Sequence, residues 1–295
     1  TVSAGSMASL IVTGVQRDLE PGDPLAALLR RHALMVGGEA LLRLGGGAYE
    51  VSISGGLTRI DGDKEAILRT QRASERYFQR PDATHVEVDP NRLSMVGGKT
   101  TVEARKISGT HWLWDTSVDF ESPDLVLNDV GRLGTGDGVM ARVGLTYRET
   151  QPGEVLRSSR FRVGQTSEWN YGGERQFTRL SSDAALTWSN FWTTRVSAQF
   201  STRAQDHRLT RGGPSVGTAR AWSSSIDLEN SSTDQTRWSA ALQYGRDEWG
   251  GWTRGVGGSI AMLPGPRWQV SLRPSYEREV NPRQYVTELS GGAPA

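Results

Sequence analysis

Four arginines recur at spacings of three and four in the segment from Lys64 to Arg80, which has a helix-forming composition and precedes Pro81. If this segment is helical, all four guanidinium groups lie on one face. A planar guanidinium group binds phosphate or carboxylate through two hydrogen bonds. The stripe therefore predicts an anion contact, for example to a lipopolysaccharide phosphate or an anionic glycan, or a plug role against acidic groups inside the protein. Its members are Arg69, Arg72, Arg76 and Arg80, and the expected acidic partners are Glu39, Glu50, Asp183 and Asp227.

Few other residues suggest catalysis or metal binding. Short acidic runs at 61–63 and 136–138 lack the further oxygen ligands of a calcium loop, so we expect turns there. No serine lies in a nucleophile-elbow sequence. We expect no catalytic residue, no metal site, no cofactor and no enzymatic activity. The histidines are far apart in sequence, with no pair at ligand spacing: His32, His85, His111 and His207.

Composition excludes several classes of protein. There are no cysteines, so disulfides and thiolate metal sites are excluded. The net charge of +1 gives no reason to expect nucleic-acid binding. No stretch approaches the ~18 uncharged apolar residues of a membrane helix. The chain starts at Thr1 without a basic-then-apolar leader, so we expect a processed form or a fragment.

Several segments instead alternate apolar and polar residues, which is the period of a strand with two unlike faces. In 192–203, Val196, Ala198 and Phe200 alternate with polar residues, and the segment from Arg267 to Glu277 divides in the same way. The polar sides of such strands predict an interior lined by Arg142, Arg195, Arg203 and Arg273, with Arg148, Arg162 and Arg237 on the same side.

About thirteen strands are expected, and many are longer than the usual soluble strand of about five or six residues. Tight turns alternate with mostly longer connections, which is the pattern of an outer-membrane barrel with short periplasmic turns and long external loops. We therefore expect an all-β, antiparallel transmembrane barrel domain over 1–295, incomplete because thirteen is odd, with a helical segment in the long loop 61–90. The expected strands are 5–14, 33–44, 47–60, 91–106, 110–119, 137–148, 156–171, 177–189, 193–204, 217–229, 236–246, 252–263 and 267–279.

Tryptophans fall near both kinds of connection, which favours two aromatic girdles at the membrane surfaces. The alternative is a soluble all-β protein whose tryptophans fill the core or act as sugar platforms. Those beside short turns are Trp112, Trp114, Trp188, Trp192, Trp238 and Trp268, and those near loops are Trp169, Trp249 and Trp252.

The run at 67–83, ILRTQRASERYFQRPDA, resembles a segment of an uncharacterised bacterial family that joins an N-terminal carbohydrate-binding-like module (family 9 type) to an outer-membrane barrel. Further similar runs are Ser122-Pro123 with NDVG at 128–131, WNYGGER at 169–175 and NPRQYVT at 281–287. The resemblance covers nearly all of the chain and implies location in the bacterial outer membrane. The module and closing strands beyond Ala295 are absent here, so sugar binding is not carried over.

Three functions are compatible with these features. The first is a channel or transport-type barrel for small or anionic solutes, because an interior ring of arginines would favour anions. The second is a non-conducting barrel that anchors a sugar-binding module or a protein partner at the cell surface. The third is a soluble all-β carbohydrate-binding protein. For either barrel we expect outer-membrane lipids and lipopolysaccharide as partners, with a glycan or protein partner as a further candidate.

Overall fold

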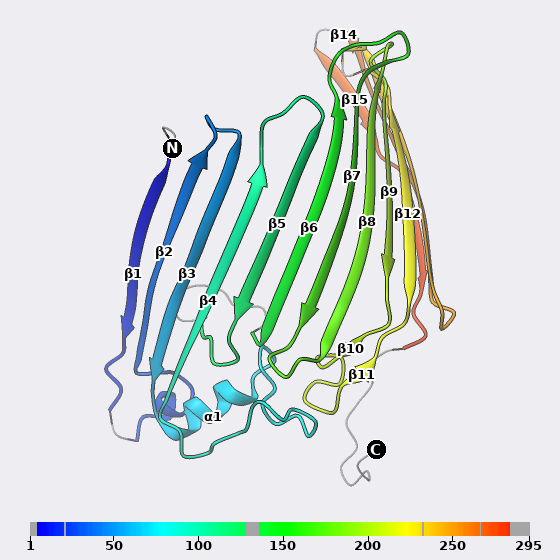
Figure 1. Ribbon diagram of the computed structural model, residues 1–295. Helices are drawn as coiled ribbons and strands as arrows, with labels where there is room; N and C mark the ends of the chain where they lie inside the picture. The colour runs from blue at the N-terminus through cyan, green and yellow to red at the C-terminus, as the bar shows by residue number, and fades with distance from the viewer. Residues whose placement is uncertain (1–4, 21, 128–135, 232, 266, 284–295) are drawn as a thin grey trace.

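The computed structural model describes the chain except for residues 1–4, 21, 128–135, 232, 266 and 284–295. Its main element is one antiparallel sheet in which nearly every strand pairs with the next one along the chain (Figure 1). The all-β antiparallel prediction is therefore confirmed. The strands are β1 (Met7–Gln16), β2 (His32–Leu44), β3 (Tyr49–Asp61), β4 (Ser94–Lys106), β5 (Trp112–Glu121), β6 (Gly138–Glu149), β7 (Leu156–Trp169), β8 (Arg175–Trp188), β9 (Thr193–Ser201), β12 (Ala221–Glu229), β13 (Thr236–Asp247), β14 (Trp252–Gly265), β15 (Trp268–Leu272) and β16 (Ser275–Val280).

The last predicted strand, 267–279, is divided into β15 and β16. Both pair with β14, and the pairs Ile260–Leu272 and Gly257–Ser275 keep one register. The interruption falls at Arg273 and Pro274, and proline has no backbone N–H to donate to a ladder. β15 and β16 thus act as one interrupted strand at the edge of the sheet.

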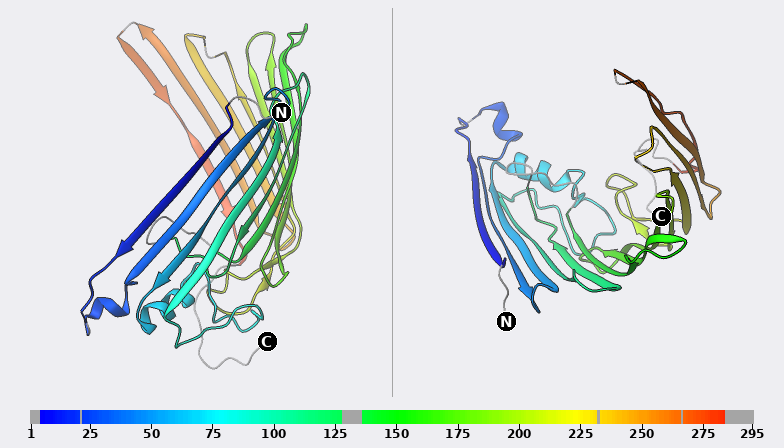
Figure 2. Two further views of the ribbon diagram at one scale, coloured as in Figure 1. Left: turned by 60° about the vertical axis from the view of Figure 1, so that its left-hand side comes forward. Right: turned by 90° about the horizontal axis from the view of Figure 1, so that it is seen from above.

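The sheet curves into an open arc when it is seen from above (Figure 2). β1 forms one edge and β15 with β16 the other, and among the described residues no pairing joins these edges. Closure of the sheet into a barrel therefore stays a prediction.

The connections differ in length between the two ends of the sheet, as the sequence predicts. Short turns such as 45–48 and 189–192 lie at the upper end of Figure 1, which we call the turn end. The long connections lie at the opposite, loop end, including 62–93 and 202–220. The loop end also holds η1 (Pro24–Ala27), α1 (Lys64–Arg72) and the short pair β10 (Gln205–Asp206) with β11 (Val216–Gly217).

The two faces of the sheet differ in chemistry. On the convex face one row of directly paired residues crosses β9, β12, β13, β14 and β16, and its members are 40% to 62% exposed. On the concave face the neighbouring rows carry charged and polar side chains. The apolar row is Val196, Ile226, Leu242, Val256 and Tyr276.

The one buried apolar cluster found among the described residues lies on the concave face at the loop end. Ala33, Ile60 and Met95 are neighbours on β2, β3 and β4, and Ile67 of α1 packs against this cluster together with Phe78. The core thus lies between the sheet and the connection that folds over it. No helix in the described part of the chain is long and apolar enough to span a membrane.

Candidate functional site

The connection between β3 and β4, residues 62–93, folds onto the concave side of the sheet, and we call it the inward segment (Figure 2). Ile67 is fully buried on its underside. The fully buried Gln71 donates to the carbonyl of Asp89 at 2.9 Å and accepts from the Asp89 N–H at 2.8 Å. These two bonds fasten the returning chain to α1, so the segment is a packed element rather than a loose loop.

The helix ends at Arg72, eight residues before the predicted end, so the prediction that four arginines share one helical face is wrong. Arg69 and Arg72 are exposed, whereas Arg76 and Arg80 are buried. Beyond the helix the chain turns, and the N–H of Phe78 returns to the carbonyl of Gln71 at 3.1 Å. Tertiary contacts therefore override the helix-forming composition after Arg72.

Arg76 is buried without a carboxylate partner among the described residues. Its guanidinium donates to the carbonyls of Leu125 and Thr70, which joins the inward segment to the 122–137 connection. Burial lowers the pKa of Arg76 to about 10, because desolvation disfavours the charged form. Arg76 thus joins two connections at an energetic cost that the packing around it must offset.

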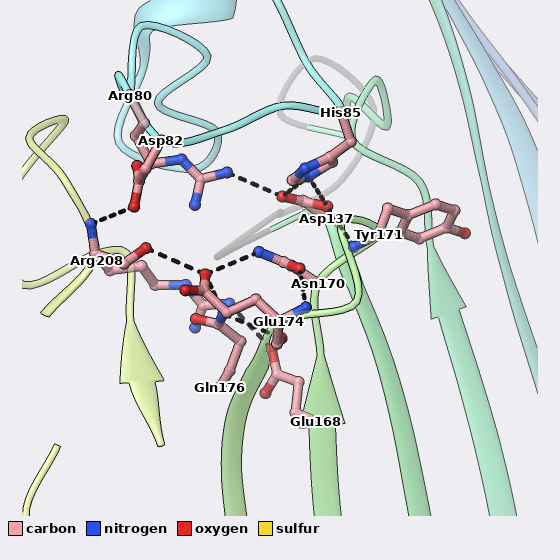
Figure 3. Close-up of polar contacts among 11 residues, drawn as sticks. Arg80, Asp82, His85, Asp137, Glu168, Asn170, Tyr171, Glu174, Gln176 and Arg208 are labelled. Carbon is pink, nitrogen blue, oxygen red and sulfur yellow. Dashed lines mark hydrogen bonds and ion pairs between the residues drawn. The ribbon is translucent and has the colours of Figure 1, made fainter. Parts of the chain in front are cut away.

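Asp137 is the centre of a second link (Figure 3). Its carboxylate accepts from Arg80 at 3.1 Å, lies 2.8 Å from Nε2 of His85 and accepts from the backbone N–H of Tyr171 at 3.0 Å. Arg80 and Asp137 are each only 2% exposed. Asp137 has a φ of 63°, a conformation that aspartate tolerates better than most residues. These four residues, the Asp137 lock, join the inward segment, the 122–137 connection and the β7–β8 turn.

A neighbouring polar network joins the 202–220 connection to the same place (Figure 3). Glu174 accepts from Asn170 at 3.2 Å and from Ser215 at 3.1 Å. Arg208 donates to the buried Glu168 at 3.1 Å, and Asp82 accepts from the Ser215 N–H. The network ties together connections that are far apart in sequence, because two of its residues come from 202–220, one from the inward segment and three from 168–174.

His207 is buried beside this network, and its Nδ1 has no hydrogen-bond partner in the part of the chain that the structure describes. Burial lowers the pKa of His207 to about 4, and the charges of Arg80 and Arg208 add to this effect. The carboxylate of Asp137, which His85 contacts, acts in the opposite direction and raises the pKa of His207.

The contacts of Asp137 hold neighbouring segments of the chain together. The carboxylate of Asp137 is shared by three donors, and among the described residues no serine or threonine hydroxyl is hydrogen-bonded to His85. Among the described residues no three histidine, aspartate or glutamate side chains gather as metal ligands would. Asp61 and Asp63 pair with Arg59 and Arg31 instead.

The concave face beyond the inward segment carries a ladder of ion pairs. Arg142 pairs with Asp119, Arg162 binds Asp115 through two nitrogens at 2.5 and 2.7 Å, and Arg195 pairs with Glu229 at 2.8 Å. Each arginine thus has its own carboxylate, so the face is close to neutral locally. Glu50, an expected partner of the stripe, pairs with Arg43 and Arg105 instead.

Arg203 and Arg273, which were also predicted to line the interior, lie outside the strands. β9 ends at Ser201, and Arg203 donates to Glu248 of the β13–β14 turn at 2.7 and 2.6 Å. These bonds and one from the Arg220 N–H hold the pKa of Glu248 down at about 2. Arg273 lies at the interruption between β15 and β16.

A cavity of about 410 Å³ lies between the concave face of β1–β4 and the 122–127 chain. Its floor includes Gly37 and Gly56, and its walls include Met35 and Leu125. Its size falls in the range of small-molecule pockets, roughly 300–1,000 Å³.

Sequence reasoning missed the partner of Arg80 and the whole polar network. A signal was present, since Asp137 stands between two glycines and two of the runs that carry the family resemblance, 67–83 and 169–175, meet at the lock. Residues 128–131 and 284–287, which belong to the other two runs, lie outside the described residues. Comparison with protein-family models and with curated protein sequences finds no match.

Proposed function

We propose that this chain forms the wall of a β-barrel in a bacterial outer membrane and that small polar solutes pass along its concave face, past the inward segment. The observation that carries the proposal is the exposed apolar row on the convex face, from Val196 to Tyr276. Soluble proteins rarely expose a contiguous apolar surface of more than a few hundred Å². Lipid is the medium that such a surface requires.

Aromatic pairs at both ends of the sheet support the membrane part of the proposal. At the turn end the rings of Trp112 and Tyr147 are 5.0 Å apart, and those of Trp192 and Trp238 are 5.2 Å apart. At the loop end the rings of Trp222 and Tyr244 are 5.3 Å apart. Aromatic bands at the two ends, with aliphatic residues between them, are typical of strands that cross a bilayer.

The concave face supports passage of polar solutes, because it carries hydrogen-bonding and charged groups that water can solvate. Three of its arginines, Arg142, Arg162 and Arg195, are ion-paired, however, so the reason for expecting a strong preference for anions is weaker than the sequence suggests. We therefore propose a passage for small polar solutes with little charge preference.

The locked inward segment favours a second candidate, a closed barrel that anchors a module or a partner at the cell surface. A segment held by the buried Arg80–Asp137 pair occupies the space that a solute would cross. The resemblance to a family whose members carry a carbohydrate-binding-like module is consistent with this second candidate.

Conductance of the protein in planar lipid bilayers separates the two candidates. Asp137→Asn leaves Arg80 buried without its carboxylate, so the segment should detach and conductance should rise above the wild-type value. Arg72→Gln, on the exposed side of α1, is the control and should conduct as the wild type does. If neither the wild type nor Asp137→Asn conducts after insertion, the passage is wrong and the anchor is favoured.

A further inference from the structure

Three arginines stand on the convex face at the loop end of β13, β14 and β16, next to the apolar residues Leu242, Val256 and Tyr276 of the same strands. Arg254 of β14 lies directly opposite Arg278 of β16, and Arg246 of β13 lies opposite Trp252. Since side chains alternate between faces, these residues share the face of Leu242 and Val256. We call Arg246, Arg254, Arg278, Trp222, Tyr244 and Trp252 the arginine–aromatic patch.

The three guanidinium groups have no carboxylate partner among the described residues. The acidic residues nearest in sequence are Asp247, Glu277 and Glu279, which alternate with Arg246 and Arg278 and so lie on the concave face. Like charges directly opposite on neighbouring strands are destabilising, so the Arg254–Arg278 pair costs free energy unless an anion lies between the two. Within the described residues, this patch therefore has no negative partner.

Two of the three guanidinium groups lie over the ring of Trp252. The central carbon of Arg254 is 4.8 Å from the ring centre of Trp252, and that of Arg278 is 5.5 Å from the same ring. Stacking of this kind uses the face of the guanidinium group and leaves its N–H donors at the edge available. Those donors match two oxygens of one phosphate.

Several arginines elsewhere on the protein already have carboxylate partners. Arg59, also on the convex side at the loop end, pairs with Asp61 at 3.0 Å, and the ladder arginines of the concave face pair with carboxylates. Free cationic groups beside an aromatic band lie at the depth of lipid headgroups, where phosphate is the abundant anion.

We infer that the arginine–aromatic patch binds the phosphate groups of membrane lipids in the leaflet at the loop end. The inference rests on the proposed function, because it requires the convex face to be in lipid. It adds to that function the chemical group of the lipid that is bound, phosphate, and the place of binding, on β13, β14 and β16.

Native mass spectrometry of the detergent-solubilised protein tests the patch directly. The probes are phosphatidylglycerol and a diacylglycerol with the same acyl chains, which lacks only the phosphate headgroup. The wild type should retain phosphatidylglycerol in preference. The double variant Arg254→Gln/Arg278→Gln should lose about thirtyfold of this preference, which corresponds to about 1 kcal/mol for each arginine.

Two controls make the result specific. Arg59→Gln removes a convex-face arginine that already has a carboxylate partner, so it should keep the wild-type preference. Arg254→Lys/Arg278→Lys keeps the charge but loses the two-bond geometry, so its preference should be intermediate. Added inorganic phosphate should not displace the lipid, because it brings no acyl chains to the apolar face.

Flotation of the same proteins with phosphatidylcholine vesicles distinguishes two kinds of failure. If the protein floats but the double variant retains phosphatidylglycerol as the wild type does, or inorganic phosphate displaces the lipid equally well, the patch inference alone is overturned. If the wild type does not float, the membrane proposal is wrong and the inference falls with it.

Discussion

The concave face has two regions built on the same strand geometry but filled in opposite ways. Over β2–β4 at the loop end, the covered region, Ala33, Ile60 and Met95 are apolar and buried beneath the inward segment. Over β6–β9, the open region, side chains such as Arg142 and Arg195 are exposed and ion-paired. Whether a position on the concave face is apolar or polar therefore depends on what covers it, and not only on which face of the sheet it occupies.

Two glycines on the concave face also differ according to what covers them. Gly97 of β4 faces the covered region, where an added Cβ would overlap the backbone of Asp124 and Leu125. Gly164 of β7 faces the open region, where the nearest atoms to an added Cβ are 3.2 Å and 3.3 Å away. Gly97 admits a neighbouring chain to the sheet, whereas a Cβ at Gly164 would require its neighbours to move only by a few tenths of an ångström.

The largest expected effect is the difference in unfolding free energy between alanine substitutions at these two glycines. Gly97→Ala should cost about 3 kcal/mol of unfolding free energy or displace the 122–127 chain, because the backbone it meets must move. Gly164→Ala should cost less than about 1 kcal/mol. Urea denaturation of both variants in one detergent measures the difference, and equal costs would remove the distinction between the regions.

The strands were predictable because each one has two unlike faces, so a period of two is visible in the sequence alone. Segments such as 192–203 show this alternation, and the structure has β9 there. The covered region was not predictable in the same way. Ala33, Ile60 and Met95 only continue the apolar pattern of their strands. The residue that packs against them, Ile67, belongs to a connection whose sequence has no period of two, so the pattern does not show that they are covered.

The end of α1 was mispredicted for a related physical reason. Composition and Pro81 favour a helix up to Arg80, but Arg76 and Arg80 leave the helix to reach Leu125 and Asp137, which lie 49 and 57 residues further along the chain. Burial of two guanidinium groups depends on these distant acceptors. Local periodicity carries no information about them.

A second prediction uses pH, because His207 lies beside the lock while β6–β9 contain no histidine. Its pKa of about 4 in the folded protein lies below the ordinary value of 6.5, so protonation favours unfolding. Stability should be full above pH 6.5, fall by about 2 kcal/mol between pH 7 and pH 5, and level off below pH 4. Thermal unfolding at a series of pH values measures this loss.

His207→Gln should flatten that profile between pH 7 and pH 5. His111→Gln is the matched control, because His111 is partly exposed and stacked on Tyr147 at the turn end, so its pH profile should follow the wild type. An unchanged slope in His207→Gln would show that another group senses pH. Protease cleavage within 205–216 should increase over the same pH range if the loop end opens first.

The smallest expected effect concerns the ion pairs of the open region. The side chain of Arg142 is 45% exposed, and its partner Asp119 also accepts from Thr101 at 2.7 Å, so Asp119 keeps a donor when the arginine is removed. Arg142→Gln should therefore cost less than about 1 kcal/mol, and a double-mutant cycle with Asp119→Asn should give a coupling energy of similar size. Raising the salt concentration should reduce that coupling further, because exposed charges are screened.

A coupling of several kcal/mol that is insensitive to salt would mean that the pair is shielded from water. The open region would then be covered as β2–β4 are, and the contrast between the two regions, together with the proposed water-filled passage, would be wrong.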